Sequence, residues 1–550
     1  MIRHIDDFLQ KSVEKFPTKT AFVEGEKSVN FKDFDTLCKR LASRILELQS
    51  SLQNAQNTQN ASQNALKIQR QIPILIILPK GISCLVSFFG TAKSGNFYTL
   101  LDDKTPILRV QQVCDILKPS ILITSKDCAN ALEIALQKQN ALENSAQTPK
   151  NSQKSPIKSI KHTIFVEDFA DFKINENALL KAKKAHIDTN LLYVFFTSGS
   201  TGVPKGVSIA HKSVIDYTFW VCEEFALNER EVLANQAPFY FDNSILDIFS
   251  SIKVGATLHI LPNALFAFPS KICEYLQRHE ISMIFWVPSV LIYFANTQVL
   301  ANFALKSLKK VLFCGEIMPN KQLNYWRKHL PNALFANLYG PTEITDVCCF
   351  YKVAREFKDD EILPIGKACA NTELLVFDEH LNLIDERQVG AKGELFVRGT
   401  SLSLGYFNDK EKTAAAFVQN PLHSNYLDLL YKTGDIVAYN DFGELLCFGR
   451  NDGQIKYQGH RIELGEIESV INSHKGVKNA VCLFDEHIIC FYESDEVLNL
   501  REFLKGKIAN YAYPKEFIRV EKFALNDNGK IDRKALKAKI NSEGFTKFGK

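Results

Sequence analysis

The sequence lacks any apolar run that is long enough to cross a membrane. Its most apolar stretch, "IPILIILP" at residues 72–79, is far shorter than the roughly 20 residues that a transmembrane helix needs. The first residues, "MIRHIDDFLQKSVEKF", are charged throughout and lack the apolar core of a signal peptide. These absences predict a cytoplasmic protein with no membrane span.

Cysteine pairs at metal-binding or redox spacing are also missing. The chain has thirteen cysteines, an odd number, and none of them stand as C-x-x-C. This pattern argues against a disulfide framework and against a zinc site, and it predicts a reducing compartment. Charge of one sign is not in large excess either, because the net charge is only +4. No zinc-finger spacing or long basic arm is present, so we expect no nucleic-acid partner.

The order of apolar and amphipathic segments indicates an α/β fold with at least two domains. A chain of 550 residues is too long for a single hydrophobic core. "ILIILP", "ILITS", "LLYVFF", "TLHILP", "SMIFWV" and "KKVLFCG" are predicted strands, and "SKICEYLQRH" and "NKQLNYWRKHL" are predicted helices. From about residue 371, "TELLVFD", "KGELFVRG", "DIVAYN" and "GELLCFGR" predict hairpins with glycine turns. "IELGEIESVINSHKGV" predicts a later helix.

Two segments are rich in glutamine and asparagine, near residues 49–70 and at 137–161. "QNAQNTQNASQN" and "QKQNALENSAQTPKNSQKSPIKSIK" are too polar to pack against a core. We interpret both as solvated insertions between ordinary elements.

A polar loop follows one of the predicted strands, in "FFTSGSTGVPKGVSIAHKS" at residues 195–213. It is not a P-loop, because Lys205, the one lysine in its first twelve residues, follows a proline rather than a glycine. Its hydroxyls, its glycines and the Lys205 ammonium nonetheless suit an anion such as a nucleotide phosphate. Taken alone, a surface turn is the alternative interpretation.

The loop resembles the phosphate-binding signature of the adenylate-forming superfamily, which includes acyl-CoA synthetases, luciferases and amino-acid adenylation domains. Five further signatures follow in that family's order: "NLYGPTE" (337–343), "GELFVRGTSLSLGYFND" (393–409), "YKTGD" (431–435), "GRNDGQIKYQGHRIELGEIE" (449–468) and "NDNGKIDRKAL" (526–536). The resemblance implies a large domain over residues 1–449, built of parallel sheets, helices and a small β-barrel. It also implies a small, mobile α+β domain over residues 450–550.

The resemblance assigns ATP and Mg²⁺ as cofactors. Tyr339 would stack on adenine, Thr342 would contact the α-phosphate, and Glu343 would help to hold Mg²⁺, a hard cation that prefers carboxylate oxygens. Asp435 would accept both ribose hydroxyls, with Arg450 as a second ribose or phosphate contact. The residues implied to hold the β- and γ-phosphates are Thr197, Ser198, Gly199, Ser200, Thr201 and Lys205.

Two positions near the C-terminus carry further roles by the same resemblance. Lys530, in "DNGKIDRKAL", matches the catalytic lysine that binds the substrate carboxylate and the charge that develops at the α-phosphate. Asp452, in "GRND", matches the hinge about which the small domain rotates between the two half-reactions. A lone lysine in such a position is otherwise a solvated charge.

The segment "APFYFDNSILDIF" (237–249) bears on the substrate. Asp242 matches the aspartate that binds an α-ammonium in amino-acid enzymes, because a buried ammonium needs a charged partner. A helix-capping aspartate is the structural alternative. "LFCGEIMPNKQL" followed by "LPNALFANLYGPTE" most resembles the D-alanine–D-alanyl carrier protein ligases, in which Cys314 would shape a small pocket. A buried apolar cysteine is the alternative for this position.

The expected pocket favours a small side chain. Its lining by position is Asn243, Leu246, Trp286, Leu312, Cys314, Leu338, Asp346 and Val347. Trp286 is bulky, which leaves little room, whereas Asn243 and Asp346 are polar and suit a hydroxyl or an amine. D-alanine is therefore the first expectation, and serine or another small polar amino acid stays open.

These residues predict an ATP-dependent amino acid–carrier protein ligase, expected to be a monomer. It would form an aminoacyl-AMP and load the phosphopantetheine thiol of a separate carrier protein in trans, since no carrier domain follows "KIDRKAL" before Lys550. The basic tail would suit an acidic carrier, or it is simply solvated. The alternatives are an acyl-CoA or fatty-acyl-AMP synthetase, which Asp242 disfavours, and a non-catalytic amino-acid or nucleotide sensor on the same fold.

Overall fold

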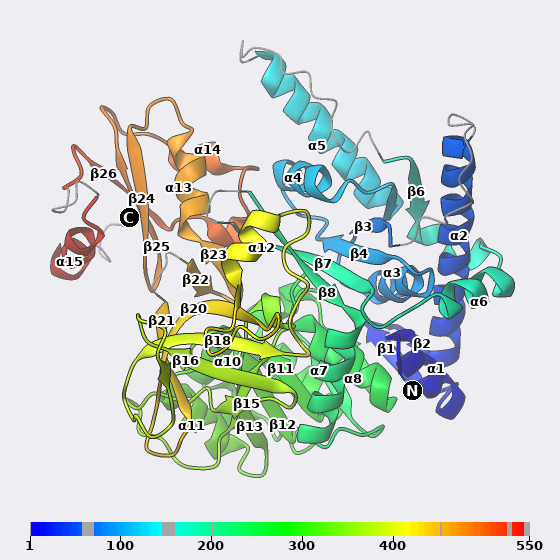
Figure 1. Ribbon diagram of the computed structural model, residues 1–550, viewed down its shortest axis with the longest axis horizontal. Coiled ribbons are helices and arrows are strands. Elements are labelled where there is room, and N and C mark those ends of the chain that lie inside the picture. The colour runs from blue at the N-terminus through cyan, green and yellow to red at the C-terminus, as the bar shows by residue number, and fades with distance from the viewer. Residues whose placement is uncertain are drawn as a thin grey trace. The chain divides into compact units, whose positions relative to one another are not determined.

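The computed structural model describes residues 2–57, 71–145, 160–199, 203–450, 454–524 and 531–543 (Figure 1). The chain divides into two compact units. The first comprises residues 1–104, 113–196 and 205–451, and the second comprises residues 105–112, 197–204 and 452–550. The architecture is mixed α/β, which confirms the predicted fold class. Within the described residues, no helix has the length and apolar character that crossing a membrane would require.

One sheet of the first unit has six strands in the order β6–β5–β3–β4–β7–β8. The strands β3, β4, β5 and β6 pair in parallel, and β7 pairs in parallel with β4. Parallel strands covered on both faces read as continuous apolar runs, which is why "ILIILP", "ILITS" and "LLYVFF" were recognisable. The bounds are β3 (Pro73–Ile77), β4 (Phe97–Leu101), β5 (Ile121–Thr124), β6 (His162–Phe165), β7 (Leu191–Thr197) and β8 (Lys205–Ala210).

The second sheet has nine strands in the order β15–β14–β13–β12–β11–β9–β10–β1–β2. Its central strands are parallel, and they confirm the strands predicted from "TLHILP", "SMIFWV" and "KKVLFCG". The bounds are β1 (Thr20–Glu24), β2 (Lys27–Asn30), β9 (Val232–Asn235), β10 (Thr257–Ile260), β11 (Met283–Trp286), β12 (Lys310–Cys314), β13 (Leu334–Tyr339), β14 (Cys349–Lys352) and β15 (Lys367–Ala368).

Helices cover these sheets, and α3 lies between them. Almost every residue of α3 is buried, and the helix contacts β3 and β4 of one sheet and β1 of the other. A helix that is apolar all round is suited to such an interior position. The helices of this unit are α1 (Asp6–Lys15), α2 (Phe31–Asn57), α3 (Ile82–Lys93), α5 (Lys126–Ser145), α6 (Glu176–Lys184), α7 (His211–Glu224), α8 (Ser244–Val254), α9 (Pro269–Arg278), α10 (Pro288–Asn296) and α11 (Asn320–His329), with 3₁₀ turns at Val166–Asp171, Asn263–Ala267, Val299–Asn302 and Thr342–Ile344. Helix α4 (Ile107–Leu117) is divided between the two units, since its residues up to 112 belong to the second.

The glutamine- and asparagine-rich segments begin inside two of these helices. Helix α2 continues to Asn57 and α5 continues to Ser145, so each helix takes in the first residues of its segment. Alanine, glutamine and leucine have good helix propensity, which allows a helix to continue beyond its packed part. The remainder of both segments, at 58–70 and 146–159, lies outside the described residues.

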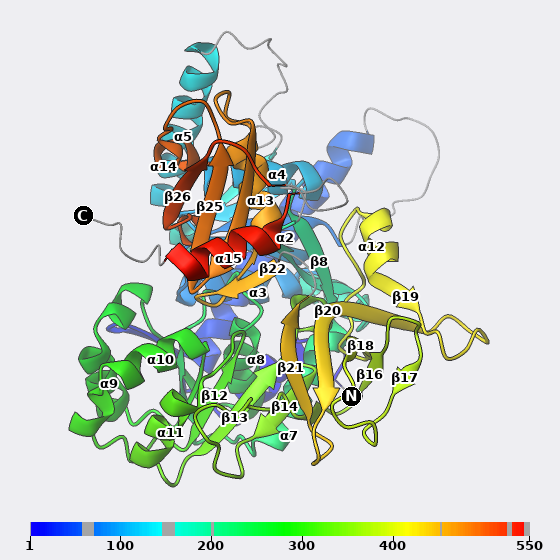
Figure 2. The ribbon, with the colours of Figure 1, turned by 90° about the vertical axis from the view of Figure 1, so that its left-hand side faces the viewer.

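The region predicted as glycine-turn hairpins is an antiparallel six-stranded sheet, in which β17, β16, β18, β20 and β19 are neighbours in that order and β21 pairs with β20 (Figure 2). The sequence resemblance describes this part as a small β-barrel. A short helix, α12 (Lys410–Ala416), precedes β19, and the Asp409 side chain caps its N-terminus. The bounds are β16 (Thr372–Phe377), β17 (Leu383–Ile384), β18 (Gly393–Gly399), β19 (Phe417–Gln419), β20 (Leu429–Tyr439) and β21 (Leu445–Arg450).

The C-terminal part of the second unit has its own hydrophobic core of Ile467, Ile471, Cys490 and Leu504, among others. The hairpin β22–β23 precedes a sheet in the order β24–β25–β26. The elements are β22 (Gln454–Tyr457), β23 (His460–Glu463), α13 (Leu464–Asn472), β24 (Asn479–Asp485), β25 (His487–Glu493), α14 (Leu500–Leu504), the 3₁₀ turn Asn510–Ala512, β26 (Glu516–Val520) and α15 (Arg533–Glu543). The predicted helix at "IELGEIESVINSHKGV" is confirmed as α13.

Candidate functional site

Three of the residues expected to contact the nucleoside lie together on three strands. Tyr339 is the last residue of β13, Asp435 lies in β20, and Arg450 lies opposite Asp435 in β21. The Tyr339 hydroxyl donates to Asp435 Oδ2 at 2.5 Å, and Arg450 Nη1 lies 3.3 Å from the same oxygen. Burial and the nearby Asp435 charge raise the pKa of Tyr339. The group presents a phenol ring, a carboxylate and a guanidinium, which together can bind a nucleoside and its phosphate.

Glu343 follows the same strand β13 and is completely buried, in the 3₁₀ turn Thr342–Ile344. The turn passes so close to the following chain that a Cβ on Gly340 would lie 2.2 Å from the Asp346 carbonyl oxygen, so only glycine fits there. Glu343 Oε1 accepts a hydrogen bond of 2.8 Å from the Tyr406 hydroxyl. Thr342, the expected α-phosphate contact, lies next to it and is nearly buried.

Tyr406 is a site residue that the sequence reasoning missed, although it lies inside the quoted motif "SLSLGYFND". The Tyr406 backbone pairs with that of Val207 of β8 in an antiparallel bridge. This pairing brings the 404–407 segment beside the start of that strand. Lys205 is the first residue of β8, and its ammonium lies 5.7 Å from the centre of the Tyr406 ring. Lys205, Tyr406 and Glu343 therefore form one group, drawn from three distant parts of the chain.

The donor set at Glu343 fits a magnesium ion that arrives with a nucleotide. A carboxylate oxygen is a ligand that Mg²⁺ prefers, and Mg²⁺ usually takes only one or two carboxylates together with substrate phosphates. Among the described residues, no group of three or more His, Cys, Asp or Glu side chains is arranged to hold a metal by itself. Glu343 is accordingly the residue that would hold the ion, with nucleotide phosphates supplying other oxygens.

The start of the glycine-rich loop belongs to the second unit. Within that unit, the Ser198 hydroxyl donates to the Arg461 carbonyl oxygen at 2.9 Å, and the Thr197 carbonyl oxygen accepts from Arg109 of α4 at 3.1 Å. Gly199 follows and is buried. Ser200 and Thr201 lie outside the described residues, as do Asp452 and Lys530, so the structure does not test the roles expected of these four.

One of the expected substrate residues, Asp346, contacts a buried tyrosine. The Tyr217 hydroxyl of α7 donates to Asp346 Oδ2 at 2.6 Å. Burial raises the pKa of Tyr217, and the charge of Asp346 adds to this effect. Burial also raises the pKa of Tyr193 in β7. The region around Asp346 is therefore fixed by Tyr217, which the sequence reasoning missed.

Two neighbouring strands form an apolar part of this region. Cys314 of β12 lies directly opposite Leu338 of β13 in the parallel register. Asn243 also lies near, because a Cβ on Gly315 would contact its amide nitrogen at 3.7 Å. Leu246, Leu312, Leu338, Cys314 and Val347 all belong to the same buried core. Leu312, Cys314 and Leu338 therefore share one face of the nine-stranded sheet.

Trp286 is not brought to this group. It is paired with Phe313 in the β11–β12 register, so its side chain points to the other face from those of Leu312 and Cys314. It packs in a separate core against Phe294, and its indole N–H donates to the Ala234 carbonyl oxygen at 2.9 Å. The bulk of Trp286 consequently gives no measure of the size of the expected pocket.

Asp242 precedes α8 but caps no part of it by its side chain. Its Oδ1 accepts from the N–H of the next residue, Asn243, at 3.0 Å, and the N-terminus of α8 has no side-chain cap. The side chain is half-buried. This arrangement gives no support to the capping alternative.

Comparison with known proteins identifies the family of the chain. The family of AMP-binding enzymes matches residues 60–407. Zwittermicin A synthase ZmaJ of Bacillus cereus is 31% identical over 481 residues, which are 84% of each chain. The D-alanine–D-alanyl carrier protein ligase of Bacillus anthracis is 28% identical over 557 residues, 97% of this chain and 99% of the other. The Vibrio cholerae adenylation domain AlmE, solved with glycyl-adenosine-5'-phosphate, has a TM-score of 0.79 at 21% identity and covers 98% of both chains.

The chain belongs to the family of AMP-binding enzymes, which confirms the resemblance to the adenylate-forming superfamily. Its relatives include both stand-alone ligases and parts of longer synthases. The chain spans less than half the length of several of these longer relatives.

Proposed function

We propose that this protein is an ATP-dependent amino acid–carrier protein ligase. It activates a small amino acid as aminoacyl-AMP, releases pyrophosphate, and transfers the aminoacyl group to the phosphopantetheine thiol of a separate carrier protein. It acts as a monomer with Mg²⁺. One of the relatives named above is a carrier protein ligase, and the chain matches it over 99% of its length, which supports the proposal.

The observation that carries the proposal is the pair of carboxylates at the expected substrate positions. Asp346 is buried and its Oδ2 accepts from Tyr217 at 2.6 Å, and Asp242 is half-buried just before α8. An amino acid brings an ammonium that can pair with such a carboxylate, whereas a fatty acid brings no cation. The same residues therefore favour an amino acid over a fatty acid.

The substrate is a small amino acid, and D-alanine is the first candidate. Cys314 and Leu338 offer an apolar surface that suits a methyl group. Asn243 and Asp346, by contrast, can hydrogen-bond a hydroxyl or an amine, so serine is the second candidate. A site that hydrogen-bonds a polar group of the substrate strongly rejects an analogue that lacks this group. An apolar pocket separates two substrates that differ by one methylene much less well.

The chain's own residues carry out the adenylation as follows. Asp242 orients the substrate through its ammonium, and Asp435 and Tyr339 hold the nucleoside. An oxygen of the substrate carboxylate then attacks the α-phosphorus of ATP, and pyrophosphate leaves. Lys205 and Lys530 stabilise the negative charge that develops on the phosphates. Mg²⁺ held at Glu343 would neutralise phosphate charge when it is bound.

The carrier thiol completes the reaction. Its thiolate attacks the carbonyl carbon of the mixed anhydride, and AMP leaves with the anhydride oxygen. No protein nucleophile is required, because the adenylate is already activated.

A pyrophosphate-exchange panel tests the proposal. It contains D- and L-alanine, D- and L-serine, glycine, the other amino acids and several fatty acids, each with wild type and with Asp242→Ala. We expect exchange with one small amino acid and its loss in the variant. Exchange with fatty acids alone, unchanged in Asp242→Ala, would establish an acyl synthetase instead. ATP binding without exchange for any acid would establish a sensor.

A further inference from the structure

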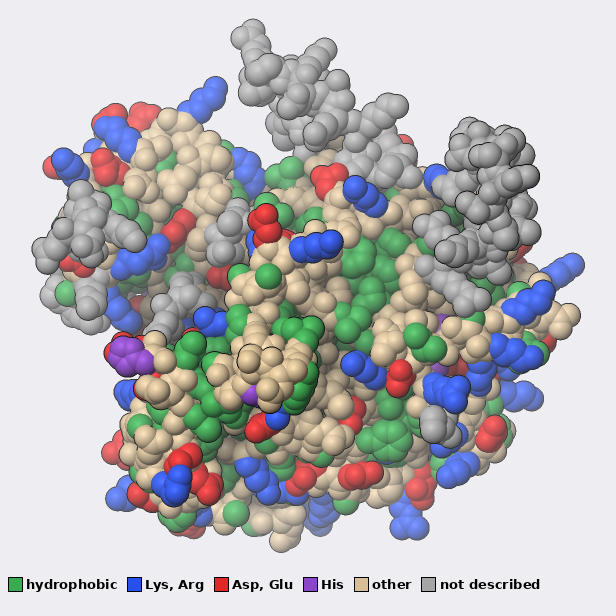
Figure 3. Space-filling model, in the orientation of Figure 1, with side chains coloured by type: hydrophobic (Ala, Val, Ile, Leu, Met, Phe, Trp, Pro, Cys, Tyr) green, Lys and Arg blue, Asp and Glu red, His purple; other side chains and the backbone are tan. Residues whose placement is uncertain are grey.

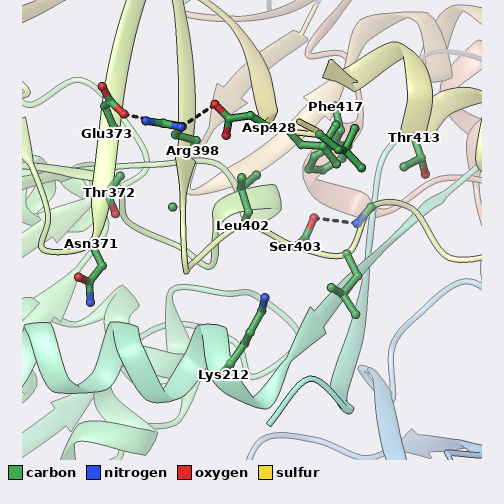
Figure 4. A pocket seen from close by; sticks show the side chains of 15 residues that line it. Lys212, Asn371, Thr372, Glu373, Arg398, Leu402, Ser403, Thr413, Phe417 and Asp428 are labelled. Atoms are coloured by element: carbon green, nitrogen blue, oxygen red, sulfur yellow. Dashed lines mark hydrogen bonds and ion pairs between the residues drawn. The ribbon is translucent and has the colours of Figure 1, made fainter. Parts of the chain in front are cut away.

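A pocket of about 740 Å³ opens on the first unit, between the start of α7 and the antiparallel sheet, and none of its lining residues belongs to the adenylation site (Figure 4). It is lined by Lys212, Asn371, Thr372, Glu373, Arg398, Gly399, Leu402, Ser403, Leu404, Gly405, Thr413, Phe417, Leu427, Asp428 and Leu429. Its volume lies within the range of roughly 300–1,000 Å³ that is usual for sites of small organic ligands.

Lys212 is the cation at the base of this pocket. It is the second residue of α7, and its half-buried side chain rises from the helix toward Leu402 (Figure 4). In the described part of the chain, its ammonium makes no hydrogen bond or ion pair. The acid one turn later on the helix, Asp216, is engaged elsewhere: it accepts from Asn371 at 2.6 Å and from the Thr400 hydroxyl.

On the far side of the pocket, Arg398 pairs with two carboxylates. Arg398 Nε donates to Glu373 at 2.5 Å, and Arg398 Nη1 donates to Asp428 at 2.5 Å. Asp428 accepts in addition from Asn420 at 2.8 Å and lies 3.0 Å from His423. Both carboxylates are therefore held by partners of their own, and Lys212 is left as the cation whose charge a ligand would balance.

The remaining wall is apolar and partly open to solvent. Leu427 is 76% exposed and Leu404 is 51% exposed, whereas Phe417 closes the inner side. Leu402 and Leu429 complete this wall. The face of the molecule in Figure 3 shows hydrophobic side chains gathered near its centre. Large exposed leucines around a recess are a common mark of a binding site rather than of a plain surface.

We propose that this pocket binds an amphipathic organic acid, with its carboxylate on Lys212 and its apolar chain against the leucine wall. A carboxylate supplies a negative charge that can pair with the Lys212 ammonium. A half-buried ion pair of this kind is stronger than one in open water. An apolar chain covers Leu404, Leu427 and Leu429 and gains the free energy of their burial. The site is distinct from that of the amino-acid substrate, which carries an ammonium and needs Asp242.

Decanoate is a suitable probe, because it combines one carboxylate with one flexible apolar chain. Titration calorimetry of the full-length protein, below the micelle concentration of decanoate, should show saturable binding of one molecule per chain. Lys212→Gln should weaken this binding by about tenfold or more, since a charge-assisted hydrogen bond is lost. Lys212→Arg should retain binding, and Leu427→Ser should weaken it several-fold through the lost apolar contact.

Matched controls separate this site from general effects. Lys184→Gln removes an exposed lysine of α6 and should leave decanoate binding unchanged. Decanol should bind more weakly than decanoate to wild type, and about equally to wild type and Lys212→Gln. Pyrophosphate exchange should persist in Lys212→Gln, which shows that the variant is folded. The proposal is overturned if decanoate does not bind saturably, if Lys212→Gln binds it as wild type does, or if decanol binds as tightly.

Discussion

Asp247 of α8 and Lys80 form a buried polar cluster beneath the segment that carries Asp242. Lys80 Nζ donates to the Gln236 carbonyl oxygen at 2.8 Å, and Asn235 Nδ2 donates to Asp247 Oδ2 at 3.0 Å. In the described structure, Asp247 Oδ1 has no hydrogen-bond partner. Burial raises the pKa of Asp247 to about 8 and lowers that of Lys80 to about 7. Both groups therefore tend toward their neutral forms.

The raised pKa of Asp247 gives a stability prediction with a definite sign. Between its unfolded and folded pKa values, the native state holds a proton that the unfolded state has lost, so stability falls as pH rises. Asp247→Asn keeps an acceptor for Asn235 and removes this effect. Between about pH 5 and pH 6, where Lys80 is largely protonated in both states, the variant should gain up to about 1.4 kcal/mol per pH unit over wild type.

Urea unfolding of both proteins at the two ends of that window measures the difference. The exposed Asp441→Asn is the matched control and should follow the wild-type pH dependence. A constant difference between Asp247→Asn and wild type at both pH values would show that Asp247 is ionised in the folded protein.

Single residues show what a motif can predict and what it cannot. Tyr339, Asp435 and Arg450 were expected from three motifs; the β20–β21 register brings Asp435 and Arg450 together, and Tyr339 reaches Asp435 from another sheet. Their residue types were sufficient, because a nucleoside needs those groups. Tyr217 was not expected, since it reaches Asp346 from an element far away in the sequence. The direction of Trp286 also depends on strand register, which no single motif specifies.

At the scale of elements, a buried ion triad joins the first three helices. Lys93 of α3 pairs with Asp35 of α2 at 2.7 Å and with Asp6 of α1. All three side chains are buried or nearly so. Burial disfavours the charge of Lys93, but the two carboxylates outweigh this and raise its pKa. The Lys93 ammonium therefore offsets the repulsion between the two buried carboxylates.

Lys93→Met should accordingly destabilise this unit strongly. Two buried carboxylates would lose their common partner, and breaking a buried pair in this way costs about 3–5 kcal/mol. Urea unfolding followed by tryptophan fluorescence measures the loss. Lys39→Met is the matched control, because Lys39 pairs with the same Asp35 at 3.0 Å from a more exposed position and should cost about 1 kcal/mol or less. Equal effects of the two variants would contradict a special role for Lys93.

Elements with a strong local signal were predictable from the sequence. The continuous apolar runs gave the central parallel strands, and the glycine turns gave β16, β18, β20 and β21. The order of strands within each sheet was not predictable. β1, near the N-terminus, pairs with β10, more than 230 residues further on, with Phe22 opposite Leu258. Such a pairing depends on packing across the whole unit, and neither strand carries a local mark of its partner.

At the scale of the whole molecule, the two units carry different parts of the proposed reaction. Asp242, Glu343 and Asp435 belong to the first unit, whereas Lys530 belongs to the second. In the second unit, Arg533 anchors α15 to α13 through Glu468, with distances of 2.8 and 3.0 Å. This ion pair fixes the element that directly follows Lys530 in the sequence.

The two half-reactions make different demands on Lys530, so one substitution should separate them. Adenylation develops negative charge on the α-phosphate, which a positioned cation stabilises, whereas thioester formation starts from an adenylate that is already made. Lys530→Ala should therefore lower amino-acid-dependent pyrophosphate exchange by about 10²–10³-fold. Transfer from supplied aminoacyl-AMP to the carrier protein should remain within a few-fold of wild type. Lys537→Ala, an exposed lysine of α15, is the control and should leave both rates unchanged. If both half-reactions fall together in Lys530→Ala, the lysine supports the fold or the carrier contact; if neither falls, its proposed role in adenylation is wrong.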